Sequence, residues 1–160
     1  MDDNGTLFLS KSRSYLTESY LPKLERALDM VSDDDVWWRP NEASNTIGNL
    51  LLHLTGSTRF WIVSVAGGAP SDRVRQEEFD ASGGWSRREL VDGLRDAVLQ
   101  ADAVLARLTA DDLLEARHVE EDPTTVLDAI YHAVEHFSMH TGQILQLVKL
   151  RAGVDLNLTD

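Results

Sequence analysis

Apolar residues recur every three or four positions along four long stretches of this chain, and no stretch alternates apolar and polar residues as a half-buried strand would. The pattern is clearest after Ser86, where Glu89 follows three positions later in the arrangement typical of a helix N-terminus. The apolar positions that continue it are Leu90, Leu94, Val98, Ala101, Leu105 and Leu108. This spacing predicts a helix from Ser86 to about Leu108 and favours an all-α fold.

Three other stretches predict long helices of the same kind. The first covers about residues 6–30, where Pro22 predicts a kink or an interruption. The second covers residues 45–68, with Asn45 as the N-cap and a pair of glycines as the stop signal. The last begins at residue 124 or 125 and runs to about residue 150, just before a glycine.

The connections between these helices are polar or rich in turn residues. Residues 31–44 form the first loop, and Pro123 lies in the last connection. Residues 71–84 form a polar crossover between the second and third helices, with one short helix near residues 74–79. Four helices of this length in 160 residues predict a single domain, residues 1–160, folded as a four-helix bundle.

Charge and cysteine content exclude several classes of function. The formal net charge of −12 argues against nucleic acid and anionic membranes as partners, because binding phosphates requires clustered Lys and Arg. The chain contains no cysteine, which removes disulfides, thiolate nucleophiles and cysteine-based zinc sites. Residues 1–5 are acidic and lack a basic and apolar leader pattern, so we expect a cytoplasmic protein. The apolar-leaning stretch 46–66 includes a histidine and an arginine, and we expect a buried helix there rather than a membrane span.

Three histidines, His132, His136 and His140, recur every four residues in the last predicted helix. Each step of four residues turns a side chain only about 40° around the axis, so all three point broadly the same way. The face centred on His136 carries no formal charge, whereas His132 leans toward the side of Asp128 and Glu135. We therefore expect His136 and His140 inside the bundle and His132 nearer its polar boundary, either outside the ligand set or as a proton shuttle or further ligand.

His53 lies in the second predicted helix, whose only formal charge, on Arg59, points about 120° away from it. A buried histidine needs partners for both ring nitrogens. One metal ion could satisfy His53, His136 and His140 together, although ordinary core histidines remain an alternative on this pattern alone. The side chains considered as partners for the outer ring nitrogens are Asn49, Gln143 and Glu135. His118 is expected to be an ordinary surface residue.

The chain resembles the DinB-like superfamily, also called the DinB/YfiT-like metalloenzymes, over nearly its full length. The motifs that carry this resemblance are Trp37-Trp38-Arg39-Pro40, the segment Asn45-Thr46-Ile47-Gly48-Asn49-Leu50-Leu51-Leu52-His53-Leu54-Thr55-Gly56, and His136-Phe137-Ser138-Met139-His140-Thr141-Gly142-Gln143-Ile144. The resemblance implies an up-down-down-up four-helix bundle, commonly dimeric, in which His53, His136 and His140 bind zinc or nickel. Thr141 departs from the family pattern, because many members have arginine at this place.

Three histidines with an open fourth position are typical of a catalytic rather than a structural zinc site. Since some relatives transfer low-molecular-weight thiols, the leading hypothesis is a metal-dependent thiol S-transferase that acts on a small-molecule substrate. A metal-dependent hydrolase is the second hypothesis, with Glu135 as the only carboxylate within one residue of a ligand. The third is a non-enzymatic, stress-related metal-binding bundle in which His132 closes the coordination shell. A homodimer is expected, and Arg39, Arg73 and Arg75 fit either an acidic group of a substrate or surface ion pairs.

Overall fold

The computed structural model describes residues 3–158, and most of these residues are helical. Four long helical segments account for most of the chain, and two of them contain π-helical stretches: α1–η1–α2 (Asn4–Ser14, Tyr15–Tyr20 and Leu21–Leu28), α3–η3 (Ile47–Thr58 and Arg59–Ala66), α5 (Arg87–Leu105) and α6 (Val126–Ala152). The connections contain η2 (Asp35–Trp37), α4 (Arg75–Asp80), η4 (Asp111–Leu114), β1 (Ala116–Val119) and β2 (Asp122–Thr125). The structure is thus mostly helical, which confirms the helical part of the all-α prediction, whereas the small sheet was not predicted. The predicted domain, residues 1–160, also includes residues 1, 2, 159 and 160, which lie outside the described residues.

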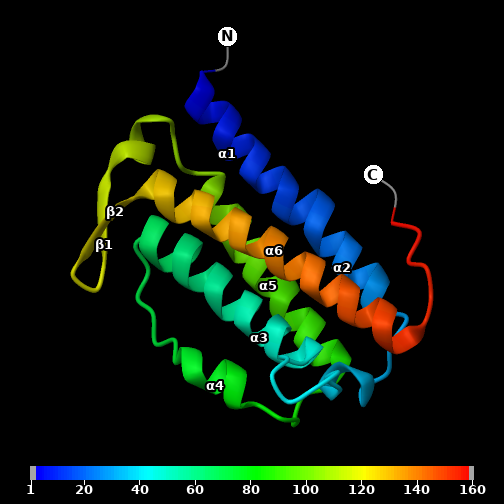
Figure 1. Ribbon diagram of the computed structural model, residues 1–160. Coiled ribbons are helices and arrows are strands. Elements are labelled where there is room, and N and C mark those ends of the chain that lie inside the picture. Colours follow the sequence, from blue (N-terminus) through cyan, green and yellow to red (C-terminus); the bar gives the residue numbers. More distant parts are fainter. Residues whose placement is uncertain (1–2, 159–160) are drawn as a thin grey trace.

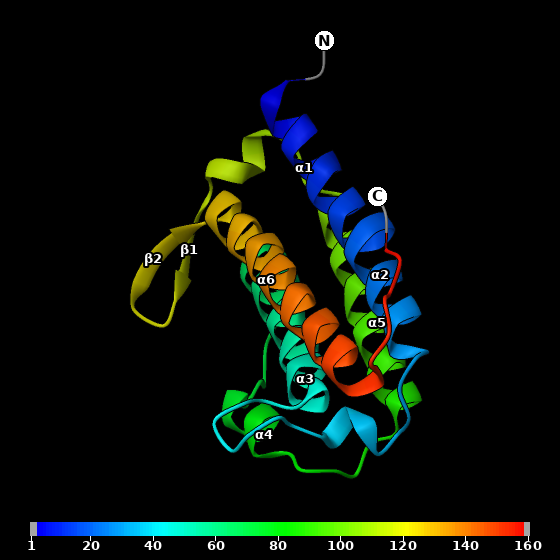
Figure 2. The same ribbon diagram turned by 45° about the vertical axis from the view of Figure 1, so that its right-hand side comes forward.

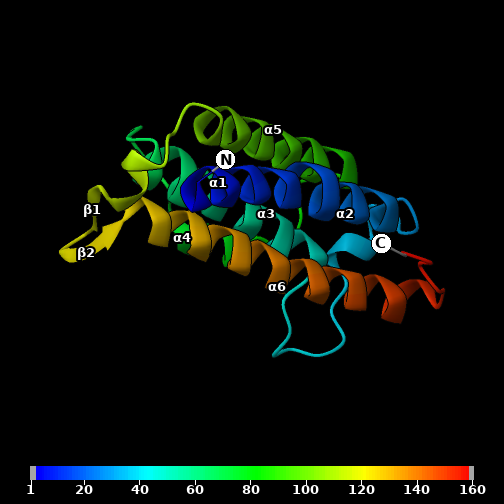
Figure 3. The same ribbon diagram turned by 90° about the horizontal axis from the view of Figure 1, so that it is seen from above.

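The long helices pack side by side (Figures 1 and 2). Both α3 and the N-terminal helix α1–η1–α2 contact α5 and α6. Seen from above, α5 and α6 lie on either side of the N-terminal helix (Figure 3). Helices α3 and α5 run in the same direction (Figure 1), so the chain must return along the molecule between them. Residues 67–86 make this return, and they bring α4 against α3.

Side-chain caps define where the helices begin. Thr46 caps α3: its Oγ1 accepts a hydrogen bond from the Asn49 backbone N–H at 3.0 Å, and the Asn49 side chain accepts one from the Thr46 N–H at 3.1 Å. The prediction of Asn45 as N-cap was therefore wrong by one residue, because the reciprocal partner is an Asn at N3 rather than the usual Glu or Gln. The predicted box of Ser86 and Glu89 is present at α5, which ends at Leu105 rather than Leu108.

Pro22 lies in the first turn of α2, directly after the π-helical η1, where the Leu21 N–H bonds to the carbonyl of Leu16. The chain stays helical through Pro22, and the regular α-helix is interrupted by this π-helical stretch. The hairpin β1–β2 was missed, since each strand has only four residues and the turn at Glu120 and Glu121 lacks the Asn-Gly type of signal. Glu120 adopts a positive φ of 55° in this turn.

The core combines apolar side chains from all four long helices, including Leu24, Leu54, Leu94 and Phe137. Buried polar side chains are distributed unevenly. Except for Ser12, those in residues 3–158 lie on α3 or its cap, on α4 or on α6, and they are Thr46, Asn49, His53, Ser57, Thr58, Glu78, His140 and Thr141. No helix in the described part of the chain combines the length and the apolar character that a membrane span requires. Most of the buried polar side chains therefore belong to α3, α4 and α6 or to the cap of α3.

Candidate metal centre

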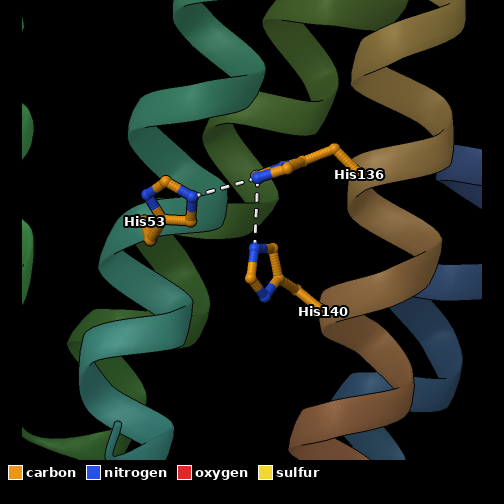
Figure 4. Close-up of side chains that lie close together, drawn as sticks. All are labelled: His53, His136 and His140. Atoms are coloured by element: carbon orange, nitrogen blue, oxygen red, sulfur yellow. Dashed lines mark hydrogen bonds between the residues drawn. The ribbon is translucent and has the colours of Figure 1, made fainter.

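Three histidines meet between α3 and α6 (Figure 4). The Nε2 atom of His136 lies 3.0 Å from Nε2 of His53 and 3.1 Å from Nε2 of His140. His53 and His140 are buried, with 4% and 8% of each residue exposed, and His136 is half-buried. The structure thus brings together the three residues that the sequence singled out.

The outer nitrogen of each ring faces an oxygen atom. Nδ1 of His53 lies 2.8 Å from a carboxylate oxygen of Glu78, and Nδ1 of His140 lies 2.7 Å from the amide oxygen of Gln143. Nδ1 of His136 lies 3.3 Å from the hydroxyl oxygen of Ser57. Nη2 of Arg73 also lies 3.2 Å from Nδ1 of His53, but Oε2 of Glu78 is nearer to both nitrogens, at 2.9 and 2.8 Å. Carboxylate and amide oxygens only accept hydrogen bonds, so His53 and His140 carry their protons on Nδ1 and turn bare Nε2 lone pairs inward.

This proton arrangement fits a bound cation. The three Nε2 atoms face one another, and when all three rings are neutral only that of His136 can carry a proton. This proton can be donated to only one of the two neighbouring Nε2 atoms. Burial and the neighbouring His140 and His53 lower the pKa of His136 to about 3, and burial lowers the pKa of His140. Extra protons are therefore disfavoured at neutral pH, whereas a divalent metal ion would satisfy all three lone pairs at once.

Glu78 is the buried carboxylate of this centre, and it comes from the crossover helix α4. Arg73 forms a two-pronged ion pair with it, with Nε 2.6 Å from Oε1 and Nη2 2.9 Å from Oε2. Burial raises the pKa of Glu78, but hydrogen bonds from Arg73 and His53 more than offset this and leave the pKa lowered. Glu78 is therefore an anion at neutral pH, with both oxygens engaged.

The side chains proposed as outer partners have different outcomes. Gln143 makes the predicted contact with His140. Asn49 is not hydrogen-bonded to any of the three histidines, because its amide group donates to the carbonyls of Glu78, Phe79 and Ala81 at 3.0, 3.3 and 2.7 Å. Glu135 is exposed, and in residues 3–158 no hydrogen bond joins it to the three histidines.

His132 lies outside the cluster. Its exposed ring stacks on His136 with centroids 5.5 Å apart and packs against Trp61 at 4.4 Å. The group of converging ligand atoms contains only His53, His136 and His140. The position of His132 at the polar boundary agrees with the prediction from helix geometry.

Sequence reasoning missed Glu78 and the role of Ser57. Ser57 follows His53 by one helical turn and shares its face, which could have indicated it. No local pattern in the sequence indicated Glu78, because its contact with His53 depends on the path of the crossover between α3 and α5. Arg73 had been considered only for a substrate or a surface pair, and it proves to be a partner of Glu78 with 15% side-chain exposure.

Three converging histidines between two long helices define a helical protein with a candidate metal centre. The family model of the DinB superfamily matches residues 17–144, so the chain belongs to this superfamily. The matched region contains all three histidines and Gln143. A search of curated proteins finds no sequence that matches the chain.

Two solved structures share the fold. A conserved protein from Enterococcus faecalis is 15% identical, with a TM-score of 0.74, and the match covers 91% of this chain and 97% of that one. A DinB-like protein from Bacillus cereus ATCC 10987 is 20% identical, with a TM-score of 0.71, and the match covers 95% of each chain. At these identities the similarity shows the fold alone.

Proposed function

We propose that this protein binds one divalent metal ion, zinc or nickel, through the Nε2 atoms of His53, His136 and His140, and that it is a thiol S-transferase. The observation that carries the proposal is the convergence of three Nε2 atoms, in rings whose Nδ1 atoms each have an oxygen atom as their nearest hydrogen-bond partner. This is the arrangement that orients histidines as metal ligands in other proteins. The family resemblance supports zinc or nickel, the up-down-down-up order of helices and a homodimer.

A metal ion held by three neutral histidines lowers the pKa of a bound thiol or water, so that a nucleophile is present at neutral pH. The three histidines would contribute their Nε2 lone pairs to the metal. The hydrogen-bond partners of the Nδ1 atoms fix the orientation of the rings, and burial keeps His136 and His140 uncharged. Because the chain has no cysteine, the thiol must be supplied by a low-molecular-weight cofactor. The thiol would lose its proton to solvent, and its sulfur would then form a bond to an electrophilic carbon of a small-molecule substrate, whose leaving group departs with the bonding electron pair.

The two alternative functions receive less support from the arrangement of side chains. A hydrolase needs a carboxylate or another base free to accept a proton from water. Glu135 instead lines a separate surface pocket together with Tyr15 and Met139, and Glu78 is paired with Arg73. A purely structural site needs a fourth protein ligand, and His132 stacks on Trp61 outside the cluster.

The metal site is tested by measuring the metal content of protein purified without a histidine tag. Wild type and His132→Ala should each retain about one equivalent of metal, whereas His53→Ala and His140→Ala should retain little. His132→Ala is the matched control, because it removes an imidazole from the same helix without removing a ligand. One equivalent of metal in both His53→Ala and His140→Ala would refute the site.

The reaction is tested separately with metal-loaded protein. A panel of low-molecular-weight thiols is combined with electrophiles that carry a leaving group. The loss of free thiol is then measured with wild-type protein and with the variant His53→Ala. Metal-dependent consumption of a thiol supports the transferase. Turnover of model esters without thiol would instead establish the hydrolase, and metal binding with neither activity would favour the non-enzymatic function.

A further inference from the structure

The crossover between α3 and α5 places the ion pair of Arg73 and Glu78 beside Nδ1 of His53. Glu78 on α4 is only 9% exposed, and its Oε2 atom accepts hydrogen bonds from Nδ1 of His53 and Nη2 of Arg73. Its Oε1 atom accepts a hydrogen bond from Nε of Arg73. Arg73 and Glu78 neutralise each other, so the pair presents an oriented acceptor to His53 without adding net charge to the interior.

Three neighbouring features hold Glu78 in this place. The side chain of Asn49 donates to three backbone carbonyls at the end of α4 and so fixes the crossover to α3. The ring of Phe79 packs on the ring of His53 with centroids 4.7 Å apart. Gly56 supplies the necessary space, because a Cβ atom at this position would collide with Oε1 of Glu78.

We propose that the Arg73–Glu78 pair is a positioning device for the metal centre: it holds His53 as the Nδ1–H tautomer and turns its Nε2 toward His136 and His140. Arg73 also keeps the carboxylate from competing for the metal, because it occupies both oxygens. The crossover would thereby be part of the metal centre without contributing a ligand atom. This inference rests on the proposed metal site.

The mechanism follows from how a carboxylate acts on a ligating imidazole. A hydrogen bond from Nδ1–H to an anionic oxygen fixes the tautomer and the ring orientation, and it makes the opposite nitrogen a stronger electron donor. Loss of such a partner commonly lowers metal affinity about ten- to a hundredfold. A merely structural ion pair would change the stability of the fold but not the protonation pattern of His53.

Gly56→Ala gives the sharpest test, because it displaces Glu78 without removing any polar group. Its matched control is Gly93→Ala on α5, where a Cβ atom would meet no atom within 4 Å. Alanine favours both helices by up to about 1 kcal/mol over glycine, so only the clash should distinguish the two variants. Glu78→Gln is the second variant, which keeps the size of the side chain but removes its charge.

Two measurements report on these variants. Nitrogen-15 NMR of the imidazole rings in metal-free protein identifies the tautomer of His53, and competition with a chromophoric chelator gives the zinc affinity. We expect Nδ1–H on His53 in wild type and Gly93→Ala, and a mixture of tautomers with ten- to a hundredfold weaker zinc binding in Gly56→Ala and Glu78→Gln.

Wild-type tautomer and wild-type zinc affinity in both Gly56→Ala and Glu78→Gln would overturn the inference. If Gly56→Ala fails to fold, Glu78→Gln decides alone. The tautomer measurement needs no metal, so it also separates this inference from the proposed function. Absence of zinc binding in wild type would refute the metal site, whereas the tautomer of metal-free His53 would still support or overturn the positioning role.

Discussion

Acidification of the metal-free protein should cost stability through His136. Burial and the nearby His140 and His53 lower its pKa to about 3 in the folded state, against 6.5 in the unfolded chain. The unfolded chain therefore binds this proton first as the pH falls. The stability associated with neutral His136 is present above pH 6.5, declines below it and is fully lost near pH 3. Between pH 7 and pH 5 the loss amounts to about 2 kcal/mol, and His140, whose pKa is also lowered, adds to it.

This loss is measured by urea unfolding in the presence of a chelator at pH 7 and at pH 5, a range that lies above the pKa of ordinary carboxylates. The variant His136→Gln has no titratable group at this position, so its loss between the two pH values should be smaller by about 2 kcal/mol. The exposed His118 on β1 supplies the control, because His118→Gln should behave as wild type. Equal losses in wild type and His136→Gln would show that the interior tolerates a protonated His136.

Three further outcomes test the site and the core. Ser57→Ala removes the oxygen beside Nδ1 of His136 and should weaken zinc binding about tenfold in a chelator competition, whereas the exposed Ser138→Ala should not; equal affinities would remove Ser57 from the site. Zinc at 100 times its Kd should raise the free energy of unfolding of wild type by about 2.7 kcal/mol and that of His53→Ala by much less, and a similar gain in both would place the metal elsewhere. Phe137→Ala empties a fully buried position and should cost about 3–5 kcal/mol in urea unfolding, and a cost below about 1 kcal/mol would contradict its place in the core.

Local patterns in the sequence were sufficient for the helices and for the inward histidines. The apolar spacing after Ser86 and its box with Glu89 specify where α5 begins, because both depend only on residues a few positions apart. The same holds for the facing of His136 and His140, which a regular helix determines by itself. The end of α5 was less predictable, since Leu108 continues the apolar spacing beyond the last helical residue, Leu105.

The surroundings of His53 depend on contacts between distant segments, so the sequence could not specify them. Glu78 lies 25 positions after His53, and only the path of the crossover brings the two together. The role of Gly56 is also invisible in a single sequence, because a glycine within a helix ordinarily indicates only weaker helix propensity. Asn49 was proposed as a direct partner of a histidine, and its actual role, fixing α4, requires knowledge of where α4 lies.

The choice of two ligands among three histidines on α6 illustrates how local and distant contacts combine. Residues at i, i+4 and i+8 of a regular helix spread over about 80°, so the outer two diverge more than neighbouring ones do. Helix geometry therefore favours a neighbouring pair, and the opposing helix decides which pair. His53 on α3 meets His136 and His140, whereas η3, the continuation of α3, places Trp61 against His132. An aromatic ring opposite the first histidine and an imidazole opposite the other two therefore leave His53, His136 and His140 as the converging group, with His132 outside it.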